Sequence, residues 1–270
     1  MELKEVYQPI SFELELVKER IKRTLKTEDE KMEEVLSYFF NQEGKFLRPC
    51  LVILSAKAVI KNKSPIFEKN LIDLATAVEI IHSASLIHDD VIDEEIERRG
   101  QLSLNRKYGN RIAVLTGDFL YTRAFSLLLE LPSPIIHLLN EASSKMCLGE
   151  IQELNINGNF SSYLEMIENK TAFFISACCQ AGGLLAQGQA KEIKNLSDYG
   201  LYLGLAYQIY DDSIDGGQLH FENLNLWIEN LANQAKNSLK DLSETIFKEK
   251  MLKLIDYILL PIKAEKWRGK

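Results

Sequence analysis

The stretch that most constrains this chain runs from Glu79 to Gly100, EIIHSASLIHDDVIDEEIERRG, and is typical of an apolar helix that ends in carboxylates. Before the carboxylates nearly every residue is apolar or small, and a helix that is apolar almost all round is buried in a core. Asp89 and Asp93 are four residues apart, so they share one face of this helix, about one turn apart. Because like charges at the edge of a core repel one another and are costly to desolvate, we expect a cation among them.

Two neighbouring residues extend this acidic cluster. Asp90 stands beside Asp89, and His82 lies on the same face of the helix two turns earlier. Hard oxygen ligands favour Mg²⁺, which typically takes one or two carboxylates and completes its shell with water and phosphate oxygens. A solvated acidic helix end is the alternative, and a single acidic cluster is more often that than a metal site.

A second copy of the arrangement favours the metal site. Residues 204–215, GLAYQIYDDSID, again predict an apolar helix that ends in Asp211, Asp212 and Asp215, with Gln208 on the same side. Asp211 and Asp215 are again four residues apart, and two such clusters more than a hundred residues from each other are improbable by chance. If the two helices face each other, six carboxylates converge on one cavity and hold several Mg²⁺ ions around a diphosphate.

Charge and composition narrow the class of protein. The net charge of −7 disfavours nucleic acid as a partner, so an anionic substrate must be met by metal ions and local Lys and Arg side chains. The four cysteines have no CxxC spacing, and the adjacent Cys178 and Cys179 are expected to be buried small residues of a reduced, cytoplasmic protein. The N-terminal stretch is too charged for a signal peptide, and no run approaches the roughly 18 apolar residues of a membrane span. We therefore expect a soluble protein without a transmembrane segment.

The rest of the chain predicts a succession of helices with almost no strand signal, punctuated by only 6 prolines and 14 glycines. No linker, low-complexity tract or tandem repeat divides it, so we expect a single all-α domain over residues 1–270. The apolar spacing predicts helices over 11–25, 30–41, 49–60, 70–93, from about 113, over 134–156, from 170, over 196–215, and two amphipathic helices within 222–262.

Polar residues at particular points of these helices are further candidates. Lys45 and Arg48 stand at the start of the helix that begins at residue 49, and a helix N-terminus with basic side chains suits a phosphate, although an ordinary basic cap has the same pattern. Lys170 and Thr171 open a strongly apolar helix, where a lysine either lies on the surface or points into a cavity. Asp118, inside a long helix, is expected to make a buried polar contact.

Six motifs together give the chain a family resemblance. GKFLRP, EIIHSASLIHDDVID with ERRG, KYGN with AVLTGDFL, GEIQEL, ENKTA and GLAYQIYDDSID occur in the order and rough spacing found in trans-isoprenyl diphosphate (polyprenyl) synthases, from about residue 10 to 215. The resemblance implies an isoprenoid-synthase-type helical bundle around a deep central cavity, Mg²⁺ dependence and usually a homodimer. It also implies sequential 1'-4 condensation of isopentenyl diphosphate onto an allylic diphosphate such as farnesyl or geranylgeranyl diphosphate.

The resemblance also implies roles for individual residues. Ionising an allylic diphosphate creates a carbocation and inorganic diphosphate, so catalysis must stabilise the charge of the leaving group. The departing diphosphate can accept the proton, so no nucleophile or strong base is needed. The implied catalytic residues are Asp89, Asp90, Asp93, Arg98, Lys170, Asp211 and Asp212, and the implied metal ligands are Asp89, Asp93, Asp211 and Asp215. Arg98 and Lys170 would bind the allylic diphosphate beside Thr171 and Gln208, and Lys45, Arg48, His82 and Arg99 would bind isopentenyl diphosphate.

Two small residues bear on product length. The growing chain must run from the first acidic cluster back along its helix, and Ala84 and Ser85 lie five and four residues before Asp89. By resemblance, bulky residues there stop growth early, so we expect a linear product longer than geranylgeranyl, which can partition into a membrane. Phe173 and Phe174 are candidates for the floor of the cavity, while close helix packing is the alternative reason for the two small residues.

The chain departs from the resemblance after Asp215, where GGQLHFENLNLW already is similar to the tail helices. Several tens of residues, including a lysine that usually contacts diphosphate, have no counterpart there, and a true deletion would leave the second metal site less well covered. Two alternatives to an active synthase therefore stay open. One is a catalytically weak partner subunit of a heteromeric synthase, and the other is a terpene cyclase or head-to-head condensing enzyme, which the basic motifs disfavour.

Overall fold

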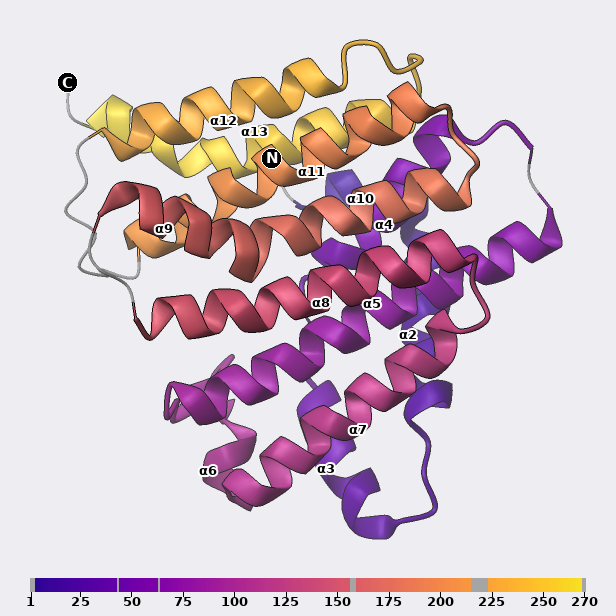
Figure 1. Ribbon diagram of the computed structural model, residues 1–270, viewed down its shortest axis with the longest axis vertical. Coiled ribbons are helices and arrows are strands. Elements are labelled where there is room, and N and C mark those ends of the chain that lie inside the picture. The colour runs from indigo at the N-terminus through magenta and orange to yellow at the C-terminus, as the bar shows by residue number, and fades with distance from the viewer. Residues whose placement is uncertain (1–2, 43, 63, 156–158, 215–222, 269–270) are drawn as a thin grey trace.

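The computed structural model describes residues 3–42, 44–62, 64–155, 159–214 and 223–268, with side chains up to Tyr257. It confirms the prediction of an all-α fold (Figure 1). The helices are α1 (Leu3–Tyr7), a 3₁₀ turn (Gln8–Ile10), α2 (Ser11–Leu25), α3 (Glu30–Phe40), α4 (Leu47–Val59), α5 (Pro65–Ile92), α6 (Leu104–Tyr108), α7 (Asn110–Leu128), α8 (Ser133–Glu153), α9 (Phe160–Ile167), a π-helix (Glu168–Ala172), α10 (Phe173–Leu185), α11 (Ala190–Ile214), α12 (Leu224–Ser238) and α13 (Ile246–Arg268). Residues 215–222, which include Asp215 and the start of the segment that departs from the family pattern, lie outside the described residues.

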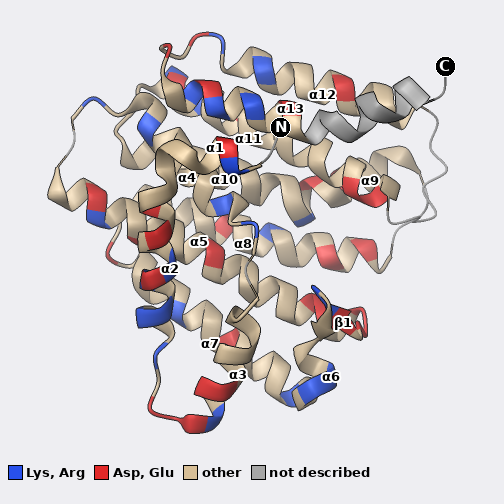
Figure 2. Cartoon of the chain, turned by 180° about the vertical axis from the view of Figure 1, so that it is seen from behind, with Lys and Arg blue, Asp and Glu red and all other residues tan. Residues whose placement is uncertain are grey.

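The two central helices of the bundle are α5 and α10, against which most of the other helices pack. α5 packs against α2, α4 and α7, while α10 packs against α4, α8 and α11, and α12 and α13 cover the far side of α11 and α4 (Figure 1). α4, which lies between the two, is buried at every position from Pro49 to Val59 because its sequence is apolar on all sides. Figure 2 shows acidic and basic residues scattered over the outer helices.

The helix α5 carries the first acidic cluster at its C-terminal end. It begins five residues earlier than predicted, because Ser64 caps it by accepting a hydrogen bond from the Phe67 backbone N–H and Pro65 fits the first turn. In the part of the chain that the structure describes, α5 is a helix long and apolar enough to cross a membrane, contrary to our expectation from the sequence. Its apolar window is 72% buried inside the protein, as expected for a core helix.

A two-stranded hairpin follows α5 and was not predicted. The strands β1 (Glu97–Arg98) and β2 (Gln101–Leu102) pair antiparallel, with Arg99 and Gly100 between them at φ of 53° and 78°. Two successive positive φ angles are the mark of a type I′ turn, for which glycine is favoured at the second position. The RRG motif therefore is a hairpin tip, from which Arg98 donates to Asp90 and the Arg99 Nη1 lies 3.5 Å from the Gln42 backbone oxygen.

Candidate active site

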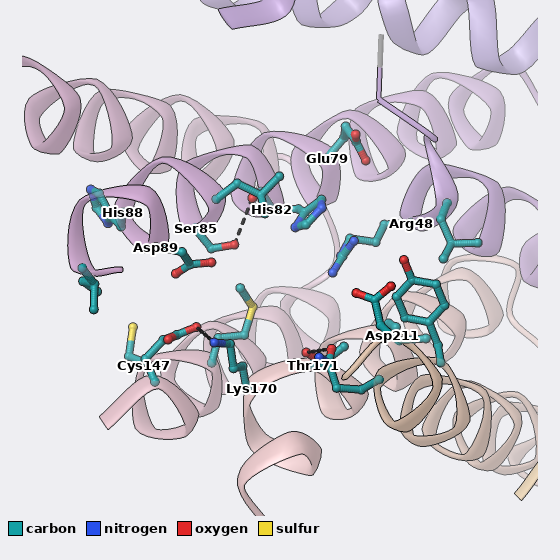
Figure 3. Close-up of a pocket in the computed structure, with 18 of the residues that line it drawn as sticks. Arg48, Glu79, His82, Ser85, His88, Asp89, Cys147, Lys170, Thr171 and Asp211 are labelled. Carbon is teal, nitrogen blue, oxygen red and sulfur yellow. Dashed lines mark hydrogen bonds and ion pairs between the residues drawn. The ribbon is translucent and has the colours of Figure 1, made fainter. Parts of the chain in front are cut away.

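A cavity of about 660 Å³ lies between α4, α5, α7, α8 and α11, closed at one side by the π-helix and the hairpin. Figure 3 shows Asp89 and Ser85 of α5 facing Lys170 across this cavity, with Arg48 and Asp211 toward its other end. The cavity brings together eleven of the residues singled out in the sequence, from all parts of the motif set: Lys45, Arg48, His82, Ser85, Asp89, Arg98, Arg99, Lys170, Thr171, Gln208 and Asp211.

The three aspartates of the first cluster have different surroundings. Asp89 lines the cavity, whereas Asp93 is an exposed residue at the C-cap of α5 and does not line it. Asp90 points the other way and is only 1% exposed. Burial raises the pKa of Asp89 well above its usual value, and the nearby Glu150 carboxylate raises it further. A bound cation would relieve this repulsion.

Asp90 holds Arg98 in place. The Arg98 Nε donates to both carboxylate oxygens of Asp90, at 2.7 and 2.8 Å, and its Nη2 donates to one of them as well. Burial alone would lower the pKa of Arg98, but the hydrogen bonds to Asp90 raise it. The Asn105 side chain donates to the Asp90 backbone oxygen at 2.8 Å and fixes the end of the helix. Asp90 therefore orients a basic side chain of the cavity, and both of its carboxylate oxygens are already bound to Arg98.

A strained turn places the basic residues before α4. Phe46, the residue before α4, has a φ of 51°, which a non-glycine residue rarely adopts. The turn brings both Lys45 and Arg48 to the cavity wall, and the Tyr7 hydroxyl holds it by donating to the Lys45 backbone oxygen. The Arg48 Nε is buried without a hydrogen-bond partner among the described residues. Backbone strain and an orphaned donor at one point are typical of a ligand site.

The π-helix positions Lys170 and Thr171. Such bulges often lie at functional sites, and this one is held by two glycines that let neighbouring helices approach it. A Cβ on Gly149 of α8 would lie 2.3 Å from the Lys170 backbone nitrogen, and one on Gly204 of α11 would lie 2.7 Å from the Ala172 Cα. The close approach of α8 aligns the Lys170 ammonium with the carboxylates of that helix.

Lys170 is bound by two carboxylates of α8. Its Nζ pairs with Glu150 at 3.0 Å and with Glu153. Burial alone would lower the pKa of Lys170, but the hydrogen bond with Glu153 and the charge of Glu150 raise it. A cationic Lys170 beside Asp89 and Glu150 can hold a negatively charged oxygen of a ligand.

A chain of hydrogen bonds fixes the orientation of side chains in the second acidic cluster. The Thr171 Oγ1 donates to the Gln208 side-chain oxygen at 2.9 Å, the Gln208 amide donates to Asp212 at 2.7 Å, and the Tyr163 hydroxyl donates to Asp212 at 2.6 Å. Asp212 is thereby turned away from the cavity, while Asp211 lines it. Asp215 lies outside the described residues.

The six carboxylates therefore do not all converge as the sequence predicted. Asp89 and Asp211 line the cavity with Glu150, and no group of three or more His, Cys, Asp or Glu side chains within the described ranges is arranged to hold a metal ion. Sequence periodicity cannot separate Asp89 from Asp90, because the helix is apolar on every side. The oxygen-only donors and the repulsion at Asp89 nevertheless fit a hard divalent cation.

The residues predicted to control product length differ in whether they line the cavity. Ser85 lines the cavity and donates its hydroxyl to the His82 backbone oxygen at 2.9 Å, whereas Ala84 is fully buried away from the cavity. Neither Phe173 nor Phe174 lines the cavity, because Phe174 is buried in the core and Phe173 packs beside Lys145. The apolar wall is formed instead by residues that carried no sequence signal of their own, namely Leu86, Tyr121, Met146, Ile151, Leu154 and Ile175.

Several other cavity residues were not foreseen. Glu79, His88, Cys147 and Glu150 line the cavity. The His88 Nε2 lies 3.1 Å from the Val114 backbone oxygen and 3.6 Å from Asp118, whose side chain is 60% exposed, so the expectation of a buried contact at Asp118 is wrong. Cys178 and Cys179 are buried as predicted.

Comparison with known proteins identifies the family. A family model described as Polyprenyl synthetase matches residues 29–218, which is well over half of the chain. The chain belongs to the polyprenyl synthetase family. This confirms the resemblance seen in its motifs.

Individual relatives agree with this assignment. The octaprenyl diphosphate synthase of Haemophilus influenzae is 41% identical over 183 residues, which cover 66% of this chain and 54% of that protein. The heptaprenyl diphosphate synthase component 2 of Bacillus subtilis is 31% identical over 96% of this chain and 78% of its own length. The chain thus spans about half the length of the octaprenyl diphosphate synthase.

Solved structures share the fold. A decaprenyl diphosphate synthase from Rhodobacter capsulatus superposes with a TM-score of 0.88 at 24% identity, covering 96% of this chain and 99% of that one. A polyprenyl synthase from Caulobacter crescentus, complexed with calcium and isoprenyl diphosphate, gives a TM-score of 0.87 at 24% identity, covering 96% of this chain and 97% of that one.

Proposed function

We propose that this family member is a prenyltransferase, a long-chain trans-polyprenyl diphosphate synthase that condenses isopentenyl diphosphate with an allylic diphosphate. The observation that carries the proposal is the cavity itself. It has Asp89 and Lys170 facing each other toward one end, Arg48 and Asp211 toward the other, and an apolar wall between α5, α7 and α8. Such a cavity can accept two diphosphate groups and one growing apolar chain.

The allylic diphosphate belongs beside Lys170. Divalent cations held by Asp89 on one side of the diphosphate and by Asp211 on the other would stabilise the charge of the leaving group. Lys170 and Arg98 would bind the same diphosphate, with Lys170 exchanging Glu150 and Glu153 for phosphate oxygens. Thr171 and Gln208 lie at the wall on this side, and their mutual hydrogen bond at 2.9 Å keeps Thr171 in one orientation.

Isopentenyl diphosphate belongs at the other end of the cavity. Lys45, Arg48 and Arg99 come from two different turns and would bind its diphosphate, which would give the Arg48 Nε an acceptor. His82 stands between the two ends. Burial lowers the pKa of His82, so that its ring is neutral and can line a cavity in which a carbocation forms.

We propose Mg²⁺ as the working cation and the cytoplasm as the location. A solved neighbour, the Caulobacter crescentus protein, is complexed with calcium and isoprenyl diphosphate, which supports a divalent cation beside a diphosphate. The relatives named octaprenyl, heptaprenyl and decaprenyl diphosphate synthase support a product longer than geranylgeranyl. The small side chain of Ser85 at the cavity wall supports it as well.

We propose that two copies of the chain form a homodimer. Large apolar residues are exposed on the two helices that flank the cavity, with Leu115 of α7 at 59% and Leu148 of α8 at 54%. Burying such exposed apolar side chains against a second copy would stabilise a dimer. Relatives named component 2 of heptaprenyl diphosphate synthase support a different second subunit as the alternative partner.

The decisive experiment incubates the full chain with Mg²⁺, labelled isopentenyl diphosphate and farnesyl diphosphate, and sizes the products by chromatography. A ladder ending in a linear product beyond geranylgeranyl is expected. A single addition would retain the enzyme class and reject the long-chain product. Absence of turnover by the folded protein would reject the synthase and favour the partner subunit, and a cyclic product would identify a cyclase.

A further inference from the structure

Glu79 is a buried carboxylate at the basic end of the cavity. It lies on α5 three residues before His82, on the same face, and is only 7% exposed. No hydrogen bond or ion pair joins its side chain to any other residue within the described parts of the chain. A buried carboxylate without such partners is costly, so its presence needs a reason.

The loop before α4 shows how Glu79 is placed against one of the arginines. A Cβ on Gly44 would lie 3.3 Å from both terminal nitrogens of Arg99 and 3.4 Å from the Glu79 Oε1. The carboxylate and the guanidinium therefore converge on the same glycine without closing an ion pair.

Glu79 is the main opposite charge acting on Arg48 and Arg99. Burial lowers the pKa of each guanidinium, and for both of them Glu79 supplies the largest attraction that opposes this effect. In return, burial raises the pKa of Glu79 to about 7, although Arg48 and Arg99 both act to lower it. Glu79 is thus about half ionised at neutral pH, so its charge can respond to an anion that binds beside the guanidiniums.

Three titratable groups near Glu79 do not change charge near neutral pH. Burial raises the pKa of the Tyr7 hydroxyl of α1 and of the Cys178 thiol of α10, and it lowers the pKa of His82 on α5 itself. All three are therefore neutral at pH 7. Two further groups line this end of the cavity, Lys45 of the loop before α4 and Tyr207 of α11.

We infer that Glu79 is the counter-ion of Arg48 and Arg99 before substrate binds, and that it takes up a proton when a diphosphate group enters between the two guanidiniums. The inference rests on the proposed function, in which these arginines hold isopentenyl diphosphate. The incoming anion replaces the carboxylate as partner of the guanidiniums and repels it, so a proton from solvent adds to a Glu79 oxygen. Diphosphate affinity consequently falls as the pH rises through neutrality.

Calorimetric titration of the full chain with isopentenyl diphosphate alone, without allylic substrate or metal, tests this coupling. Titrations at pH 7 in two buffers of different ionisation enthalpy give the number of protons taken up. The wild-type protein is expected to take up about half a proton more than Glu79→Gln. Between pH 7 and pH 8 the Kd of the wild-type protein should rise relative to that of Glu79→Gln by up to about fivefold.

Two further variants sharpen the result. Glu79→Asp keeps a carboxylate and should retain the proton uptake with weaker binding. Glu13→Gln changes a carboxylate of α2 that pairs with Lys57 away from the cavity, and it should behave like the wild-type protein. If Glu79→Gln does not fold, a wild-type proton uptake no larger than the ligand's own ionisation would overturn the inference.

The outcomes separate this inference from the proposed function. If the wild-type protein binds isopentenyl diphosphate but Glu79→Gln has the same proton uptake and the same pH dependence, the role of Glu79 is rejected and the synthase stands. If the folded wild-type protein does not bind isopentenyl diphosphate between pH 6 and 8, the proposed function and the inference fall together.

Discussion

Adjacent residues of α5 have opposite environments, and this decides their roles. Asp89 faces the cavity while Asp90, one residue later, is 1% exposed and bound to Arg98. Successive residues of a helix are separated by about 100°, so one aspartate can supply a ligand oxygen while the next orients a guanidinium. The chemistry of this cavity is therefore set by single positions within each motif.

The pKa of Glu79 predicts a pH-dependent stability. Its pKa is raised from 4.5 to about 7 in the folded protein, so its contribution to stability is fully present below about pH 4.5 and is lost as the pH rises to 7. Glu79→Gln removes this loss. The free energy of unfolding of the variant should exceed that of the wild-type protein by about 2 kcal/mol more at pH 8 than at pH 5.5. Urea unfolding at both pH values measures this difference, and a constant difference would contradict it.

Ser85 and Ala84 provide a matched pair for the control of product length. Ser85→Phe puts a large ring into the cavity and should shorten the product, which chromatography of the reaction mixture measures. Ala84 is fully buried in the core, so Ala84→Phe should instead lower the free energy of unfolding by about 1–3 kcal/mol. An unchanged product from Ser85→Phe, or a shorter one from a stable Ala84→Phe, would show that the chain grows along another wall.

At the scale of elements, irregular pieces of backbone carry the basic groups. Arg98 and Arg99 stand on a hairpin with a type I′ turn, Lys170 on a π-helix, and Arg48 after a residue with positive φ. The regular helices bury apolar faces, while these turns and bulges aim polar groups into the space that the helices leave. Strain of this kind is retained where it serves a site.

Gly149 tests the link between helix packing and Lys170. A Cβ there would lie 2.3 Å from the Lys170 backbone nitrogen, so α8 and the π-helix must move apart in Gly149→Ala. We expect a loss of about 2 kcal/mol in the free energy of unfolding and weaker binding of the allylic diphosphate. Ser144→Ala on the exposed face of α8 is the control and should remain within about 0.5 kcal/mol of the wild-type protein. Equal stability of the two variants would mean that the contact is not tight.

At the scale of the whole molecule, the sequence predicts the long helices well and the cavity in part. Apolar spacing identifies α2, α3, α5 and α11 because each is long enough for its pattern to stand out. The hairpin has two-residue strands, too short for any alternation, and the π-helix has no pattern of its own. On a helix that is apolar all round, periodicity cannot say that Ser85 meets the cavity and Ala84 does not. Glu79 is a lone carboxylate in an apolar run, and this pattern could have identified it as a further cavity residue from the sequence.

The exposed apolar residues of α7 and α8 lead to a prediction for the assembly. A homodimer through these helices would bury Leu115 and Leu148 against a second copy, and a two-fold axis would present each patch to its equivalent. Charges introduced there would then face each other across the axis. A variant with Leu115→Lys and Leu148→Lys should sediment as a monomer at concentrations where the wild-type protein is a dimer. Ile66→Lys is the control, because Ile66 is at least as accessible as the two leucines but lies roughly 35 Å along α5 from Asp89, at the opposite end of the helix. A dimeric double variant would place the interface elsewhere, and a monomeric wild-type protein would favour a second kind of subunit on the same two helices.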